Sequence, residues 1–170
     1  MNGVLAHPRA PRVLLGAVVL LLLAALVGLA SLPAGADSAA GVVPPGRRVA
    51  ASAPVAGARV LLLSDAGRLN VLVAYKGDKG WHGIGVDPAP RGSLAAWTAT
   101  RGGQGVPALS AVYGRADGGH VRVKWADGRV AETTTASDGT YLLARPGHVR
   151  SSSVSVLGDD GAVLTEVEGP

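Results

Sequence analysis

Residues 121–130 read Val-Arg-Val-Lys-Trp-Ala-Asp-Gly-Arg-Val, and this decapeptide decides the fold class of the chain. Apolar and charged residues alternate in its first half, so Val121, Val123 and Trp125 share one side of an extended strand and two cations occupy the other. The Ala-Asp-Gly that follows is typical of a tight turn, because glycine accepts a positive φ and aspartate bonds its own backbone. The pattern predicts a β-hairpin with one buried face.

The register of this hairpin is the uncertain part of the prediction. A two-residue turn would place Val130 opposite Trp125 and Glu132 opposite Val123. A carboxylate beside a core valine is a mismatch, since charged side chains avoid a buried face. We therefore expect a bulge or a sheet rim at this position.

The same combination of strand, turn and second strand occurs twice more. Residues 60–69 read Val-Leu-Leu-Leu-Ser-Asp-Ala-Gly-Arg-Leu, and residues 154–163 read Val-Ser-Val-Leu-Gly-Asp-Asp-Gly-Ala-Val. The three turn glycines are 61 and 33 residues apart, and this unequal spacing favours reused hairpin chemistry over a repeat protein.

Short apolar runs separated by Gly or Pro continue through the whole of residues 59–170. Such spacing indicates an all-β fold, and we expect an antiparallel β-sandwich of the Ig-like or prealbumin-like kind. The sequence has no Phe and no Cys, so three Trp, three Tyr, Leu and Val must fill the core without disulfides. The predicted strands are 59–64, 69–76, 81–86, 94–100, 108–115, 120–126, 129–135, 140–145, 149–157 and 162–167.

Residues 134–147 read Thr-Thr-Ala-Ser-Asp-Gly-Thr-Tyr-Leu-Leu-Ala-Arg-Pro-Gly. This stretch resembles the T-x-x-D-G-x-Y…P-G signature of transthyretin-like and CnaB-like β-sandwich modules, which include the carboxypeptidase regulatory domain. The resemblance covers roughly residues 112–165. It implies that an Asp138-Gly139 turn precedes a strand whose Tyr141 enters the core, and it implies little about function. The composition also resembles that of small envelope proteins of high-GC actinobacteria.

Residues 13–32 contain no charge and match the length of a helix that crosses the hydrocarbon core of a bilayer. Arg9 and Arg12 precede the run, and this favours a cytoplasmic N-terminal tail of residues 1–12 and an extracytoplasmic remainder. We expect a retained, single-pass signal anchor in the cell membrane, because the run exceeds the usual length of a signal-peptide core. The alternative is a secreted protein cleaved after Ala36, where Ala-Gly-Ala forms a typical cleavage site.

Residues 33–58 contain four prolines among Ala, Gly, Ser and Val, without periodicity or aromatic residues. This composition predicts a spacer that holds the domain of residues 59–170 away from the membrane. The formal net charge of the chain is +4, and it falls to +2 when residues 1–36 are left out because Arg9 and Arg12 then go. No basic stripe remains, so we expect no nucleic-acid partner.

No motif of a known catalytic, phosphate-binding or metal-binding kind occurs in the sequence, and we expect neither a cofactor nor enzyme activity. The carboxylates Asp117, Asp127, Asp138, Asp159 and Asp160 lie next to turn glycines, and turn formation explains them better than a calcium site does.

The most unusual segment is residues 75–86, in which Lys79, Trp81 and His82 lie among glycines. Glycine lets a backbone approach a ligand closely, and a Trp–His pair can stack on one. The other interpretation is a hairpin loop whose Trp81 packs back into the core. If a binding surface exists, these three side chains are the candidates for it.

These patterns predict a membrane-anchored β-sandwich with a non-catalytic binding or scaffolding role in the cell envelope, its partners being the bilayer and an envelope protein or glycan. One alternative is a small secreted hydrolase or carbohydrate-active domain. It requires a pocket that brings His82 close to a carboxylate. The other alternative is an accessory subunit of a membrane complex that acts through residues 13–32.

Overall fold

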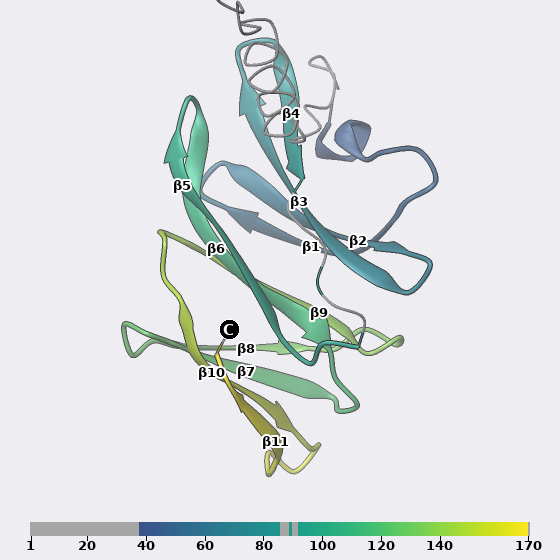
Figure 1. Cartoon of the computed structure of the whole chain (residues 1–170), viewed down its shortest axis with the longest axis vertical. Helices are drawn as coiled ribbons and strands as arrows, with labels where there is room; N and C mark the ends of the chain where they lie inside the picture. Colours follow the sequence, from purple (N-terminus) through teal and green to yellow (C-terminus); the bar gives the residue numbers. More distant parts are fainter. Residues whose placement is uncertain (1–37, 86–88, 90–91, 170) are drawn as a thin grey trace, which may run out of the picture. The chain divides into compact units, whose positions relative to one another are not determined.

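The structure is a computed structural model that describes residues 38–85, 89 and 92–169 (Figure 1). Contacts divide the chain into two compact units, Met1–Ala30 and Ser31–Pro170, and every described residue belongs to the second. The described residues form antiparallel β-sheets and one short 3-10 helix, which confirms the all-β prediction. Among them, no helix has the length and apolar content that crossing a bilayer requires. The predicted membrane segment, residues 13–32, lies outside the described residues.

Sheet A is a four-strand meander in the order β1-β2-β3-β4. Tight turns join its first three strands: Ala56-Gly57 and Ala66-Gly67 each have two consecutive positive φ angles, as a two-residue turn matching the twist of the strands requires. The strands of sheet A are β1 (Arg48–Val55), β2 (Ala58–Asp65), β3 (Arg68–Gly77) and β4 (Gly80–Gly85).

The linker prediction is wrong for part of residues 33–58. Residues 39–42 form the 3-10 helix η1 (Ala39–Val42), and β1 pairs along its length with β2, with a bulge between Val49 and Ala51. Ala39 and Val42 are buried. These residues are part of the fold because β2 needs a partner for its free edge, which a local composition pattern does not reveal.

Sheets B and C contain the remaining strands, and the residue ranges agree with the predicted strands to within a few positions. Sheet B has the order β5-β6-β9, and sheet C has the order β11-β10-β7-β8. Their bounds are β5 (Ala96–Gly103), β6 (Val106–Arg115), β7 (His120–Trp125), β8 (Val130–Thr134), β9 (Thr140–Pro146), β10 (Ser151–Leu157) and β11 (Val163–Glu168).

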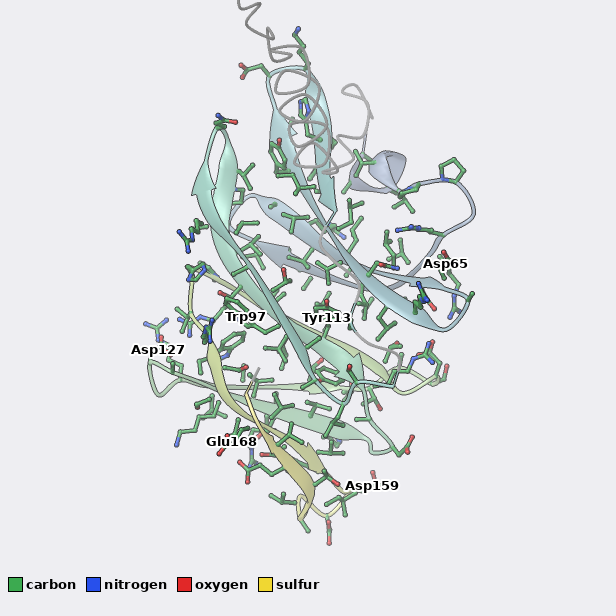
Figure 2. All side chains as sticks on the ribbon, in the orientation of Figure 1. Asp65, Trp97, Tyr113, Asp127, Asp159 and Glu168 are labelled. Atoms are coloured by element: carbon green, nitrogen blue, oxygen red, sulfur yellow. The ribbon has the colours of Figure 1, made fainter. Side chains whose placement is uncertain are left out.

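Sheet B is covered on both faces by apolar side chains (Figure 2). Leu109, Ala111 and Tyr113 of β6 join a cluster with the inner faces of β2 and β3. Val112 of β6 belongs to a second cluster, with Trp125 and other residues of sheet C. The described fold therefore contains two cores between sheets, one between A and B and one between B and C, and a third, smaller apolar cluster between sheet A and η1, where the sequence indicates a single sandwich.

The β7–β8 hairpin resolves the register question. Trp125 N–H donates to Arg129 O at 2.8 Å, so the loop has three residues and Gly128 has a φ of 82°. This loop shifts the pairing by one residue and places Arg122, rather than Val123, opposite Glu132. The Arg122 Nε to Glu132 Oε1 distance is 2.6 Å. The expected mismatch is removed by the longer turn, and an exposed ion pair takes its place.

Candidate functional site

The outer face of sheet A, which points away from sheet B, has an uneven surface set by strand register. Arg59 of β2 pairs with Ala74 of β3, and Ala74 pairs with Gly83 of β4. Because paired residues point to the same face, the side chains across this row become shorter, from arginine to alanine to glycine. Gly83 and Ala74 leave room for η1, which packs on β3 and β4 through Ala39 and Val42.

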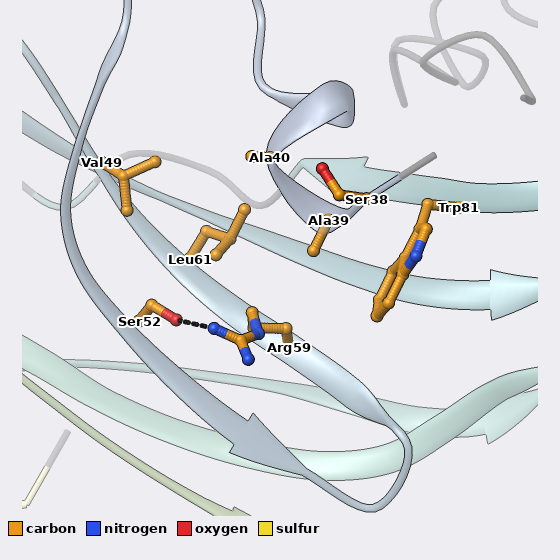
Figure 3. A pocket seen from close by; sticks show the side chains of 8 residues that line it. All are labelled: Ser38, Ala39, Ala40, Val49, Ser52, Arg59, Leu61 and Trp81. Carbon is orange, nitrogen blue, oxygen red and sulfur yellow. Dashed lines mark hydrogen bonds between the residues drawn. The ribbon is translucent and has the colours of Figure 1, made fainter. Parts of the chain in front are cut away.

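A groove of about 570 Å³ opens beside η1 on this face (Figure 3). Buried Leu61 and Ala39 belong to its apolar part, and half-buried Trp81 stands at one side. The groove is lined by Ser38, Ala39, Ala40, Val49, Ser52, Arg59, Leu61 and Trp81. It therefore combines an apolar surface, one indole, one guanidinium and two hydroxyls.

Among the described side chains that line this groove, Arg59 alone carries a charge. Its Nη1 donates to Ser52 Oγ at 3.3 Å, and among the described residues no carboxylate lies within ion-pair distance of it. The neighbouring cations Arg47 and Arg48 do have acidic partners, Asp65 at 4.0 Å and Asp138 at 3.2 Å. The groove thus presents one cation whose charge no described side chain neutralises.

The structure divides the three residues that the sequence groups as a candidate site: Trp81 lines one groove, and Lys79 and His82 line another. Trp81 pairs with Lys76 and points to the outer face with η1, whereas His82 pairs with Tyr75 and points to the opposite face. Lys79 lies in the turn between β3 and β4 and is exposed. Consecutive residues of a strand alternate between faces, so Trp81 and His82 line two different grooves.

A second groove of about 450 Å³ lies between the β3–β4 and β5–β6 turns. Lys79 and His82 line it together with Tyr75, Asp78 and Gln104. The His82 and Tyr75 rings stack with centroids 5.5 Å apart and planes at 22°. Within the described residues, no hydrogen bond or ion pair joins His82 directly to a carboxylate, although Asp78 lines the same groove; the hydrolase alternative, which also admits a contact through one water, stays a prediction.

Three of the turn aspartates bond their own turns, in agreement with the sequence prediction. Asp127, Asp138 and Asp160 each accept the backbone N–H two residues further along. A side-chain hydrogen bond from Thr140 holds the pKa of Asp138 below its ordinary value. In the part of the chain that the structure describes, no three His, Asp or Glu side chains gather closely enough to hold a metal ion.

Asp127 is the most strongly perturbed carboxyl group. Arg145 donates from both Nη atoms to its two oxygens, at 2.9 and 2.8 Å. This bidentate hydrogen bond lowers the pKa of Asp127 to about 2, and the same contact raises the pKa of Arg145. Arg145 also lies 5.3 Å from the centre of the Trp125 ring, so this cluster fixes a corner of the B–C core.

Sequence reasoning names Trp81 but misses Arg59, Ser52 and η1 as groove residues. One signal was present: Val60, Leu61, Leu62 and Leu63 are apolar without alternation, which is typical of a strand buried on both faces. Such a strand requires a cover on its second face, and η1 is that cover.

Comparisons with protein-family models, with curated proteins and with solved structures found no match for this chain. The likeness of residues 112–165 to transthyretin-like modules stays a prediction from the motif.

Proposed function

We propose that the chain is a membrane-anchored, extracytoplasmic module with a non-catalytic binding role in the cell envelope, and that the outer groove of sheet A is its binding site. One observation supports this proposal most directly. Trp81 and Arg59 line the same apolar groove, and no described side chain neutralises the charge of Arg59. An indole supplies contact area, and a guanidinium supplies a directed charge. Both groups are enriched where proteins recognise partners.

The lining chemistry supports binding rather than turnover. The polar side chains of its described lining are one guanidinium and the hydroxyls of Ser38 and Ser52. A general acid or base needs a pKa near the working pH, and a nucleophilic serine needs an adjacent base. The groove offers surfaces and hydrogen bonds to a ligand.

Anchoring through residues 13–32 is the second part of the proposal and rests on their length, their lack of charge and the arginines before them. The folded unit would then face the envelope, where an exported chain without Cys depends on packing alone.

We also propose that sheets B and C form the prealbumin-like unit that the signature of residues 134–147 predicts. Asp138 and Gly139 form the turn before β9, Gly139 has a φ of 76°, and Tyr141 is 1% exposed. These positions match the roles that the resemblance implies for the motif. Sheet A stands outside that motif and contains the groove.

The test uses the full chain in lipid nanodiscs and purified envelope fractions from a cell that produces it. We expect the chain to bind at least one polysaccharide or protein fraction, and the variants Arg59→Gln and Trp81→Phe to weaken that binding. Arg68→Gln is the matched control, because Arg68 is an exposed cation on the same sheet that does not line the groove. Equal binding by all four proteins would refute the groove as the site.

Cell fractionation tests the anchor separately. A retained anchor predicts the whole chain in the membrane fraction after an alkaline wash, with residue 1 still present. A mature chain that starts at Asp37 in the medium would refute this part of the proposal and would support cleavage after Ala36.

A further inference from the structure

We infer that the outer groove of sheet A takes a saccharide that bears a carboxylate. This inference rests on the proposed binding role of the groove and names the chemistry of its ligand. Three properties of the lining support it: the position of the indole, the state of the guanidinium and the fully paired backbone of β2 beneath them.

The Trp81 ring provides a flat apolar surface at the side of the groove (Figure 3). The ring packs against the η1 cluster and stays half-buried, so its orientation is held while part of it faces the groove. A pyranose ring has an apolar C–H face that fits an indole in the same way as other flat apolar groups do. A groove of about 570 Å³ is within the usual size range for small ligands.

Arg59 selects for negative charge. Its guanidinium is bonded to the neutral Ser52 hydroxyl and has no acidic partner among the described residues, so most of its donors are available. A planar guanidinium matches a carboxylate through two parallel N–H···O bonds. Arg59 itself is exposed, so a ligand from solution can reach its guanidinium directly.

The backbone around the groove favours a saccharide over a peptide. The groove lies on the face of sheet A, where Leu61 and Arg59 of β2 are paired on both sides, to β1 and to β3. Along β2, a bound peptide would find no free N–H or C=O groups; the free edge of the sheet belongs to β1, whose Val49 and Ser52 stand at the border of the groove. Ring hydroxyls, in contrast, need only side-chain partners such as Ser38 and Ser52, which are exposed at the groove.

The experiment titrates the full chain in nanodiscs with three probes: trigalacturonic acid, the neutral galactose trisaccharide with the same linkages, and inorganic phosphate. Calorimetry gives the affinities. We expect the acidic trisaccharide to bind about tenfold more tightly than the neutral one, as a charge-assisted contact predicts. Added salt should weaken the binding of the acidic trisaccharide and should leave the affinity for the neutral trisaccharide unchanged.

Variants assign the two roles. Arg59→Gln should remove the acidic preference and leave the weak binding of the neutral sugar, whereas Trp81→Phe should weaken both sugars and keep their ratio. Arg68→Gln should bind like the parent chain. Circular dichroism and the denaturation midpoint of each variant establish that the fold is retained.

Four outcomes would overturn the inference: equal affinities for the two sugars, a preference that survives Arg59→Gln, no binding of either sugar, or phosphate that binds as tightly as the acidic sugar. If the groove variants still reduce binding of an envelope fraction, the binding role stands and only the ligand class is wrong. If they do not, the proposed function fails as well.

Discussion

Strand β6 shows how differently the two cores are built. Toward sheet A it presents Leu109, Ala111 and Tyr113, which meet the aliphatic side chains of β2 and β3. Toward sheet C it presents Val112 and Ser110, and the Ser110 hydroxyl donates to Gly147 O and accepts from Val149 N–H, both at 2.8 Å. The A–B core is therefore held chiefly by packing, whereas the B–C core also depends on directed hydrogen bonds.

The aromatic residues follow the same division. Trp97 and Trp125 pack in the B–C core, and each lies about 5.3 Å below an arginine, Arg150 and Arg145 respectively. Trp97 Nε1 donates to Val149 O at 3.1 Å. Tyr113 and Tyr75 belong to the A–B core, so the division concerns the two indoles and Tyr141, whose polar tips or ring faces have named partners on the B–C side. The two faces of one sheet should consequently respond to different kinds of substitution.

The largest expected loss of stability is that caused by Gly114→Ala, on the side of β6 that faces the B–C core. A Cβ at this position would overlap the carbonyl of Leu94, the group that accepts the Tyr141 hydroxyl at 2.7 Å. We expect a loss of about 4 kcal/mol in the free energy of unfolding, from backbone displacement and the lost bond together. Denaturation by urea measures it. Gly85→Ala is the control, since a Cβ there meets nothing within 4 Å, and equal losses would contradict the clash.

Substitutions at two neighbouring residues of β6 allow a direct comparison of how the two cores contribute to stability. Leu109→Ala should cost about 3 kcal/mol, because Leu109 is fully buried in the aliphatic core and truncation leaves a cavity. Ser110→Ala removes little volume but leaves Gly147 O and Val149 N–H without their partner, so we expect about 2 kcal/mol. Unfolding free energies of both variants and of Ser110→Thr give the measurement. A neutral Ser110→Ala would contradict the assigned role of the hydrogen bonds.

Tyr141→Phe is a smaller perturbation of the B–C core. Burial raises the pKa of the Tyr141 hydroxyl far above its ordinary value, so the group stays neutral and donates its bond to Leu94 O. Removing this hydroxyl should cost about 1 kcal/mol and should not change the ring packing. Thermal unfolding with a near-ultraviolet spectrum tests both expectations. A loss as large as that of Gly114→Ala would show that the ring itself had moved.

The smallest effect is the pH dependence of the Asp127–Arg145 pair at the corner of the B–C core. Since the folded-state pKa of Asp127 is lowered to about 2, its ion pair stabilises the fold above the ordinary value of 3.8 and loses this effect as the pH falls toward 2. Asp127→Asn should therefore be slightly less stable than the parent at pH 7. The two should converge near pH 2, and a constant difference between pH 7 and pH 2 would contradict the linkage.

The sequence predicts the ten strands from β2 to β11 well because their ends are marked by local chemistry. Glycines such as Gly67, Gly128 and Gly161 occupy positive-φ turn positions that few other residues tolerate. Strand β1 also ends at a positive-φ turn, Ala56-Gly57, but Pro54 and the small residues before it read as a spacer. Its residues become a strand through pairing with β2, and strand propensity depends on such packing more than on local composition.

The candidate site follows the same rule. Alternation along β4 was sufficient to separate Trp81 from His82, since adjacent residues of a strand face opposite sides. Arg59 could not be added to Trp81 from the sequence, because their proximity depends on the register of two hairpins. The three-residue β7–β8 loop is a similar case, in which one additional turn residue exchanged the partner of Glu132.

Because η1 and β1 are part of the fold, the chain segment that precedes the folded unit is much shorter than the linker that the sequence predicts. A spacer of residues 33–58 could extend over about 90 Å, long enough to sample distant layers of an envelope. With η1 beginning at Ala39, six residue steps separate Leu32 from Ser38, a contour length of about 20 Å at most. Under the anchoring proposed above, a ligand of the groove would have to be present close to the bilayer surface, because so short a segment could not carry a binding module far from it.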